Sequence, residues 1–136
     1  MAARTFTLDE IINHLLPLWQ SRLGMRDWFF SVEILPVERM GDNEGFSNSF
    51  EKKRHSYIAL CDPREMRTDR IEPYDMEVVL VHEMLHSQLK CFEGRIGSHR
   101  DIIQEQTIHA HSVSLVKAWR AAEKILCREC QHNGGH

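Results

Sequence analysis

The segment of this chain that most constrains its fold is VVLVHEMLHSQLK, residues 78–90. It places His82 and His86 four residues apart, and Glu83 directly follows the first histidine. On a helix, side chains four residues apart leave the same face about 6 Å from one another, so one small cation can contact both imidazoles. In the His-Glu-x-x-His arrangement, the two histidines bind zinc and the glutamate accepts a proton from water at the metal.

Apolar residues lie on nearly all sides of the expected helix, which predicts that it is buried within the fold. These residues are Met76, Val78, Val79, Leu80, Val81, Met84, Leu85 and Leu89. The two histidines and the glutamate in such a helix need partners, because an unpaired polar group in an apolar interior costs about 2 kcal/mol or more. A metal ion with its water would satisfy all three side chains. The alternative for a buried histidine is a hydrogen bond to a backbone carbonyl.

The composition is that of one domain that can bury a core without disulfides. The chain has 136 residues, of which 42% are hydrophobic and 27% are charged. Its net charge of -3 argues against binding of nucleic acid through overall charge. No apolar run of about eighteen residues is present, and the N-terminus lacks a basic segment followed by an apolar one. We therefore expect no membrane span, no secretion signal, a cytoplasmic location and no nucleic-acid partner.

The residues before the histidine helix predict one further helix and a small sheet. Thr7 and Glu10 form a capping box at the start of the first helix, which Pro17 must kink or split. Apolar alternation and turn residues predict three strands, the second of them polar and at a sheet edge. The three strands are expected at residues 28–35, 46–53 and 55–61. Residues 37–45 are expected to form a loop, and residues 62–74 a charged, irregular connection.

The residues after the histidine helix predict a turn and a second long helix. Gly94 and Gly97 allow the turn, and the helix is expected from His99 to about Leu126. One stripe of this helix, at steps of three or four residues, comprises Ile102, Glu105, His109, Ser112, Val116 and Trp119. Because large apolar side chains recur along the stripe, we expect it to face the core and Glu105 to be buried. A buried carboxylate without a cation would be expensive and would tend to take up a proton.

Zinc in a catalytic site usually has three protein ligands and one open position. The candidates for the third ligand are His99, Asp101, Glu105, His109 and His111. Glu105 lies nineteen residues beyond His86, which is enough for the chain to turn and return as an antiparallel helix. We favour Glu105 because its inward position requires a cation, whereas His99 lies at a helix start, where exposure costs little. His99 is the alternative ligand.

A buried HExxH helix, a short turn and a glutamate-bearing helix, with a few strands before them, resemble the gluzincin class of zinc metallopeptidases, to which thermolysin belongs. The chain is more similar still to their small single-domain versions from prokaryotes and phages. The resemblance covers about residues 7–126 and rests on His82, Glu83, His86 and, by placement, Glu105. It implies a zincin-like α+β fold with an N-terminal helix, a three-stranded sheet, the HExxH helix and a long C-terminal helix carrying the third ligand.

The resemblance also implies the chemistry of the site. A Zn²⁺ ion would be held by His82, His86 and Glu105, Glu83 would be the general base, and the substrate would be a peptide or protein. The strand at residues 55–61 would hold the substrate as an added strand, or its edge position would serve only as protection from aggregation. Donors available to the oxyanion are Tyr57, Tyr74, His99, His109 and His111. Thermolysin-like enzymes have an aspartate one turn after the glutamate, where this chain has a histidine, so the side chain that orients a zinc histidine is left open.

Two alternative functions fit the same motif. One is a DNA-associated protease of the SprT-like kind, with His99 as third ligand and Cys127 and Cys130 as the remnant of a cysteine module. The basic run at residues 52–55 is its one electrostatic support. The other is a noncatalytic zinc-bound domain that binds a peptide in the same groove.

The cysteines are expected as thiols rather than as a disulfide framework. Cys61 and Cys91 fall in apolar segments and are expected to be buried. Residues 127–136, CRECQHNGGH, are interpreted as a frayed tail after a domain that spans residues 1–126. A second zinc site at Cys127 and Cys130 is the alternative interpretation of this tail.

Overall fold

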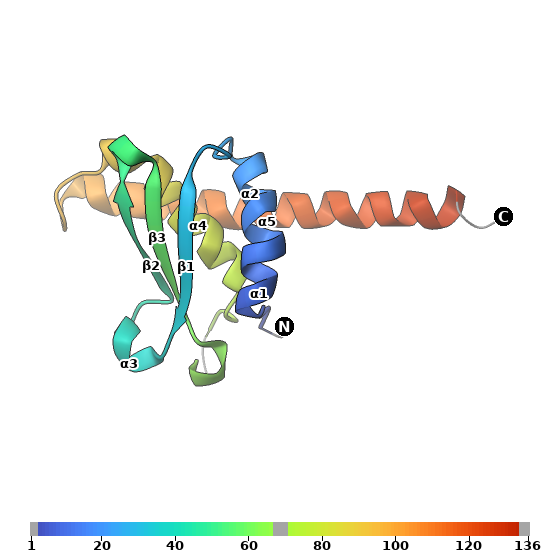
Figure 1. Ribbon diagram of the computed structural model, residues 1–136, viewed down its shortest axis with the longest axis horizontal. Helices are drawn as coiled ribbons and strands as arrows, with labels where there is room; N and C mark the ends of the chain where they lie inside the picture. The colour runs from blue at the N-terminus through green and yellow to red at the C-terminus, as the bar shows by residue number, and fades with distance from the viewer. Residues whose placement is uncertain (1–2, 67–70, 134–136) are drawn as a thin grey trace.

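The computed structural model describes residues 3–66 and 71–133, and a three-stranded mixed sheet forms one layer of it (Figure 1). The strands are β1 (Phe29–Leu35), β2 (Gly45–Phe50) and β3 (His55–Cys61), in the spatial order β1-β3-β2. β3 pairs in parallel with β1, with Phe29 opposite His55, and antiparallel with β2. The prediction of three strands is confirmed, with the bounds of β3 as expected and β2 at an edge.

The central position of β3 contradicts the expectation that it holds the substrate. Both of its edges hydrogen-bond to neighbouring strands, so it cannot accept an added strand. Its sequence explains this position, because Ile58, Ala59, Leu60 and Cys61 are all buried. A strand with apolar side chains on both faces belongs in the middle of a covered sheet.

The N-terminal helical segment packs beside β1 on the sheet. Its predicted capping box is present: the Thr7 hydroxyl accepts a 3.2 Å hydrogen bond from the Glu10 amide, and the Glu10 carboxylate accepts one of 3.0 Å from the Thr7 amide. The segment comprises α1 (Leu8–Glu10), a π-helical stretch (Ile11–Leu15) and α2 (Leu16–Arg22). Pro17 lies in the first turn of α2, and the wider turns before it accommodate its ring and its missing amide. The split of this helix that Pro17 was predicted to cause is therefore a change from π-helical to α-helical turns.

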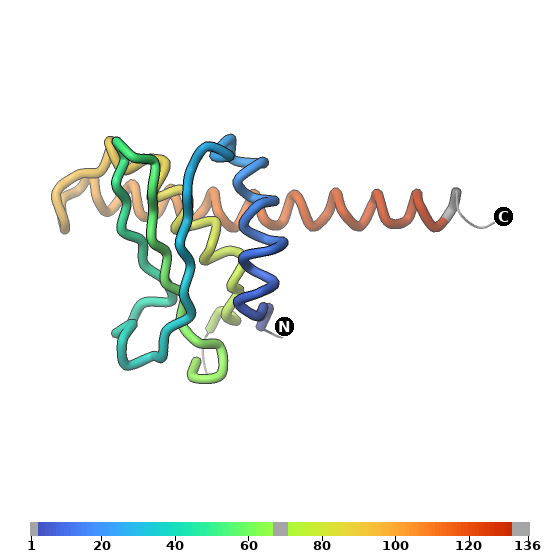
Figure 2. Tube along the Cα trace, in the orientation of Figure 1, coloured from blue at the N-terminus to red at the C-terminus, as the bar shows by residue number. Residues whose placement is uncertain are grey.

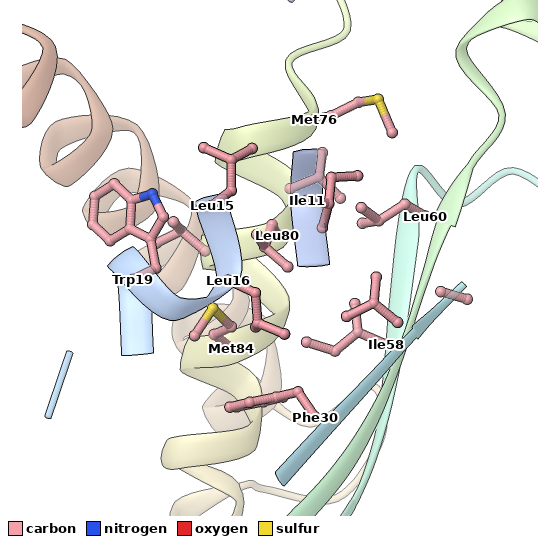
Figure 3. Packing of buried hydrophobic residues seen from close by; sticks show 14 of the residues in the cluster. Ile11, Leu15, Leu16, Trp19, Phe30, Ile58, Leu60, Met76, Leu80 and Met84 are labelled. Atoms are coloured by element: carbon pink, nitrogen blue, oxygen red, sulfur yellow. The ribbon is translucent and has the colours of Figure 1, made fainter. Parts of the chain in front are cut away.

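The hydrophobic core lies between the sheet, the N-terminal helical segment and α4 (Met76–Gln88), as Figure 3 shows. Its fully buried side chains include Ile11, Trp19, Met25, Ile58, Leu60, Met76, Leu80 and Met84. α4 packs against β2 and β3 on one side and against α5 on the other. The prediction that the histidine helix is buried is therefore confirmed, because the sheet covers one side of α4 and α5 covers the other.

Residues 37–45, predicted as a loop, contain the short helix α3 (Val37–Met40). Met40 is buried in the core, and Gly41 follows with a φ of 61°, a backbone conformation that glycine adopts at little cost. A single helical turn is too short to show the apolar periodicity by which helices are recognised in a sequence.

The charged connection at residues 62–74 contains a 3₁₀ turn, Pro63–Glu65, and its other described residues are irregular, as predicted. Asp62 begins this turn, and its carboxylate accepts a 3.0 Å hydrogen bond from the amide of Arg64. Residues 67–70 of the connection lie outside the described residues.

The last helix, α5 (His99–Asn133), is the longest element, and its C-terminal half projects beyond the rest of the fold (Figures 1 and 2). It begins after Gly97, whose φ is 78°, and the Ser98 hydroxyl accepts a 3.2 Å hydrogen bond from the Asp101 amide. The sequence placed its end near Leu126, whereas the first seven residues of the supposed tail continue the helix. No helix in the described part of the chain has the length and apolar character needed to cross a membrane.

An ion-pair network fastens the middle of α5 to the start of α4. The Arg120 guanidinium donates to both carboxylate oxygens of Asp75, at 2.7 and 3.0 Å, and to Glu77 at 2.9 Å. The second carboxylate oxygen of Glu77 accepts a 2.8 Å hydrogen bond from the Trp19 indole. Three helical segments thus meet at one mostly buried polar cluster, which sequence analysis did not anticipate.

Candidate metal site

The regular geometry of α4 places its two histidines on one face. Asp75 caps the helix, since its carboxylate accepts hydrogen bonds from the amides of Glu77 at 3.1 Å and Val78 at 3.2 Å. With about 3.6 residues per turn from this start, His82 and His86 project from the same side. That side faces the first turns of α5.

The three predicted ligands meet between α4 and α5. The Nε2 atom of His82 lies 2.8 Å from Oε1 of Glu105, and Nε2 of His86 lies 2.8 Å from Oε2 of the same carboxylate. The two Nε2 atoms are 3.1 Å apart. Ligand atoms about 2.0 Å from a tetrahedral zinc ion are roughly 3.3 Å from one another, so an ion would separate these groups by only a few tenths of an ångström. The three side chains could therefore hold a metal ion.

Glu105 lies at the open side of this cluster rather than in the core. Its side chain is 54% exposed, compared with 16% for His82 and 18% for His86. The predicted stripe of α5 is buried at Ser112 and Val116 but exposed at Ile102 and Trp119. In the first turns the inward face instead runs through Gln104 and Ile108, each one residue before the predicted Glu105 and His109. The expected burial of Glu105 is wrong, although its carboxylate contacts both histidines.

His82 is electrically suited to bind a cation. Burial lowers the pKa of His82, and the neighbouring His86 lowers it too, against the raising effect of the Glu105 carboxylate. A neutral imidazole has a nitrogen lone pair available for a metal ion, whereas a protonated one does not.

Glu83 is buried at the wall of the same site. Its carboxylate accepts a 3.3 Å hydrogen bond from the Ser47 hydroxyl on β2. Burial, above all, raises the pKa of Glu83 to about 7, and the charge of Glu105 contributes to the rise. A carboxyl group with such a pKa can accept and release a proton near neutral pH.

These groups surround a cavity of about 350 Å³. His82, Glu83, Glu105 and His109 line it from α4 and α5, and residues 42–45 line it from the segment that leads into β2. Because Glu105 is half exposed at the rim, the three possible metal ligands can be reached from solvent. The cavity thus combines a possible metal site with a buried proton acceptor.

Gly45 brings the start of β2 unusually close to α4. A Cβ atom at this position would lie 2.6 Å from Cγ1 of Val79 and 3.3 Å from Cγ of Glu83. Glycine therefore permits the close approach of strand and helix that closes one side of the cavity. Sequence analysis treated this glycine only as part of a loop.

Glu93 is another residue that sequence analysis missed. Its Oε1 atom lies 3.6 Å from Nδ1 of His86, whereas the other ring nitrogen, Nε2, contacts Glu105. A carboxylate in this position can orient a histidine ligand. Glu93 lies in the turn between α4 and α5, where no local spacing relates it to the motif.

Of the five side chains considered as oxyanion donors, His109 lines the cavity. Its ring centroid is 6.0 Å from that of His82. The other four lie elsewhere: Tyr57, Tyr74, His99 and His111. The Tyr74 hydroxyl, for example, donates a 2.9 Å hydrogen bond to the backbone carbonyl of Cys61.

The alternative ligand and the cysteines are separate from this cluster. His99 lies at the exposed start of α5, and the possible metal ligands gathered in the described part of the chain do not include it. Cys61 is buried as predicted, but Cys91 is exposed, which contradicts the expectation. Cys127 and Cys130 are exposed on the projecting part of α5.

The arrangement as a whole brings two imidazoles, two carboxylates and a further histidine around one opening. They come from α4 and α5, and the start of β2 closes one side. Comparison of the chain with known protein families, with characterised proteins and with solved structures finds no match.

Proposed function

We propose that the protein is a zinc-dependent metallopeptidase with a zincin-like fold. The observation that supports it is the meeting of His82, His86 and Glu105 beside the buried Glu83, at a cavity lined by His82, Glu83 and Glu105. Two imidazoles and one carboxylate are a donor set typical of catalytic zinc, and this set leaves a position for substrate or water. Zinc is favoured over magnesium and calcium because those ions prefer oxygen ligands alone.

The side chains divide the reaction between them. The zinc ion, when bound, supplies a Lewis acid that polarises the peptide carbonyl and activates water near neutral pH. Glu83 would accept the proton of the attacking water and pass it to the leaving amine. Glu93 would keep the His86 ring in its ligand orientation.

The substrate would approach along β2. This strand lies at an edge of the sheet, and its first residue, Gly45, lines the cavity. An extended peptide can add to such an edge through backbone hydrogen bonds. β2 therefore takes the role that the sequence assigned to β3.

Glu83→Gln tests the catalytic part of the proposal. The change is nearly isosteric, so zinc content measured by elemental analysis should stay close to that of the wild type. Hydrolysis of denatured casein should fall by a factor of about 100 or more, because the amide cannot accept the proton. Undiminished hydrolysis by the zinc-bound variant would contradict the role of Glu83. A wild type that binds zinc but cleaves no peptide would instead be the noncatalytic domain.

Glu105→Ala tests the metal site. Zinc occupancy should drop because one of three protein ligands is lost. Glu129→Ala, on an exposed turn of the same helix, is the matched control and should keep the wild-type occupancy. Loss of zinc in His99→Ala, with full occupancy in Glu105→Ala, would favour the SprT-like arrangement instead.

The basic run at residues 52–55 lies away from the proposed site. Lys52 and Lys53 belong to the turn after Phe50, whereas Gly45 at the other end of β2 lines the cavity. The strand between these ends spans roughly 17 Å. Phosphates bound at Lys52 and Lys53 would therefore not be held beside the proposed zinc ligands.

A further inference from the structure

A second cavity, of about 560 Å³, adjoins the metal site. The two cavities share Glu44, Val78, Val79 and His109 among their lining residues. One cleft therefore continues from the proposed metal ligands along the groove between α4 and α5. The proposed reaction uses only the first part of this cleft.

The two parts of the cleft differ in charge. Asp42, Glu44, Glu83 and Glu105 make the metal end rich in carboxylates. At the far end, α5 contributes Lys117 and Lys124, both exposed, and Arg4 lies in the opposite wall. The cleft is thus acidic beside the proposed metal ligands and more basic away from them.

Ion pairs within the protein do not cancel the difference in charge between the two ends of the cleft. Arg120, between the two lysines on α5, has its charge balanced by Asp75 and Glu77. The described lining of this cavity holds three acidic residues, Glu44, Glu72 and Asp75, against four basic ones, Arg4, Lys117, Arg120 and Lys124. The apolar part of the lining, which includes Val78, Val113 and Ala121, gives the cavity a surface suited to the body of a side chain.

We propose that the second cavity binds a carboxylate of the peptide substrate three to four residues from the scissile bond, through Lys117, with Lys124 two helical turns farther along α5 adding positive charge. This inference rests on the proposed peptidase function. Lys117 follows His109 by eight residues of helix, which places it roughly 12 Å farther along the cleft. An extended peptide covers this distance in about three to four residues. The carboxylate is that of an aspartate, a glutamate or the C-terminus of the peptide.

The charge of the cleft favours a peptide over a nucleic acid. A polyphosphate chain that ran along the whole cleft, from Lys117 to the metal end, would meet the carboxylates there, where like charges repel. A peptide can place neutral backbone beside those carboxylates and an acidic group beside the lysines. The scissile bond and the recognised charge then occupy different parts of one cleft.

Cleavage-site profiling with a synthetic library of short randomised peptides tests the inference. For the zinc-loaded wild type, mass spectrometry should show aspartate and glutamate enriched about threefold to tenfold at three to four residues from the cleaved bond, as expected for exposed ion pairs. Lys117→Glu/Lys124→Glu should abolish or reverse this enrichment. Lys52→Glu/Lys53→Glu, which makes the same charge change at the far end of β2, should leave it unaltered. Libraries with free and amidated C-termini separate a terminal carboxylate from an acidic side chain.

A binding measurement separates this inference from the peptidase proposal. The same library is passed over immobilised, zinc-loaded Glu83→Gln protein, and the retained peptides are sequenced. Retention of acidic peptides that requires Lys117 and Lys124 supports the cavity assignment even if the wild type cleaves nothing. Cleavage or retention without any preference for acidic residues would overturn it, as would lysine-dependent binding of single-stranded DNA in preference to every peptide. Circular dichroism of the reversed-charge variants confirms that they are folded.

Discussion

At the scale of single residues, the chemistry of the site depends on both local and distant neighbours. His82, Glu83 and His86 could be placed from the sequence because their relation is fixed within little more than one turn of a helix. Ser47, which donates a hydrogen bond to Glu83, is 36 residues away from it, and Gly45 is more distant still. Such contacts depend on which strand packs against α4, and no local spacing encodes that.

Gly45→Ala should destabilise the protein and reduce its activity. The new Cβ atom would meet Val79, a β-branched side chain with little rotamer freedom in a helix, so the start of β2 must shift. We expect a loss of about 1 to 3 kcal/mol in the free energy of unfolding, measured by urea denaturation. Asn48→Ala, at an exposed position of the same strand, should change it by less than about 0.5 kcal/mol. Equal stability of the two variants would show that the approach of β2 to α4 is not tight.

At the scale of elements, α5 is held against α4 at two places. The contacts of Glu105 with His82 and His86 lie near its N-terminal end, and the network of Arg120 with Asp75 and Glu77 fastens its middle. The sequence predicted this helix, the turn before it and the approach of Glu105 to both histidines. It did not predict which side chains of the first turns face α4, or the continuation of the helix past Leu126, because apolar periodicity marks neither.

Arg120→Met should test the second attachment. Removing the guanidinium leaves two mostly buried carboxylates without their cation, so the free energy of unfolding should fall by about 2 to 4 kcal/mol. Arg128→Met, on the exposed part of the same helix, should have an effect below about 0.5 kcal/mol. Thermal denaturation followed by circular dichroism compares the two. A smaller loss in Arg120→Met than in Arg128→Met would contradict a stabilising role for the network.

At the scale of the whole molecule, a bound metal ion would connect α4 and α5. These two helices are otherwise held together by packing and by the Arg120 network, which joins the start of α4 to the middle of α5. The α+β organisation, the three strands and the long last helix followed from apolar patterns and turn residues. The order of the strands did not, because β3 pairs with β1 across an intervening strand and turn. Parallel pairing of this kind is a property of tertiary packing rather than of either segment alone.

Removal of zinc should therefore lower the stability of the entire domain. An ion that binds only the folded state contributes about 4 kcal/mol when its concentration is a thousand times its Kd. For a domain of this size we expect a chelator to lower the Tm by roughly 10 °C, measured by scanning calorimetry. Glu105→Ala should show little response to the same chelator. An equal decrease in both proteins would mean that the stabilising metal is bound elsewhere.

The length of α5 also makes its bending measurable. Cys91 lies in the turn before its first residue and Cys127 near its far end, and both thiols are exposed. Roughly 40 Å of helix separates the two positions. Fluorophores attached to these thiols, with Cys130→Ser to remove the neighbouring thiol, would register any change in the curvature of the helix as a change in energy transfer. The native cysteines thus provide a distance probe that runs from the turn after the histidines into open solvent.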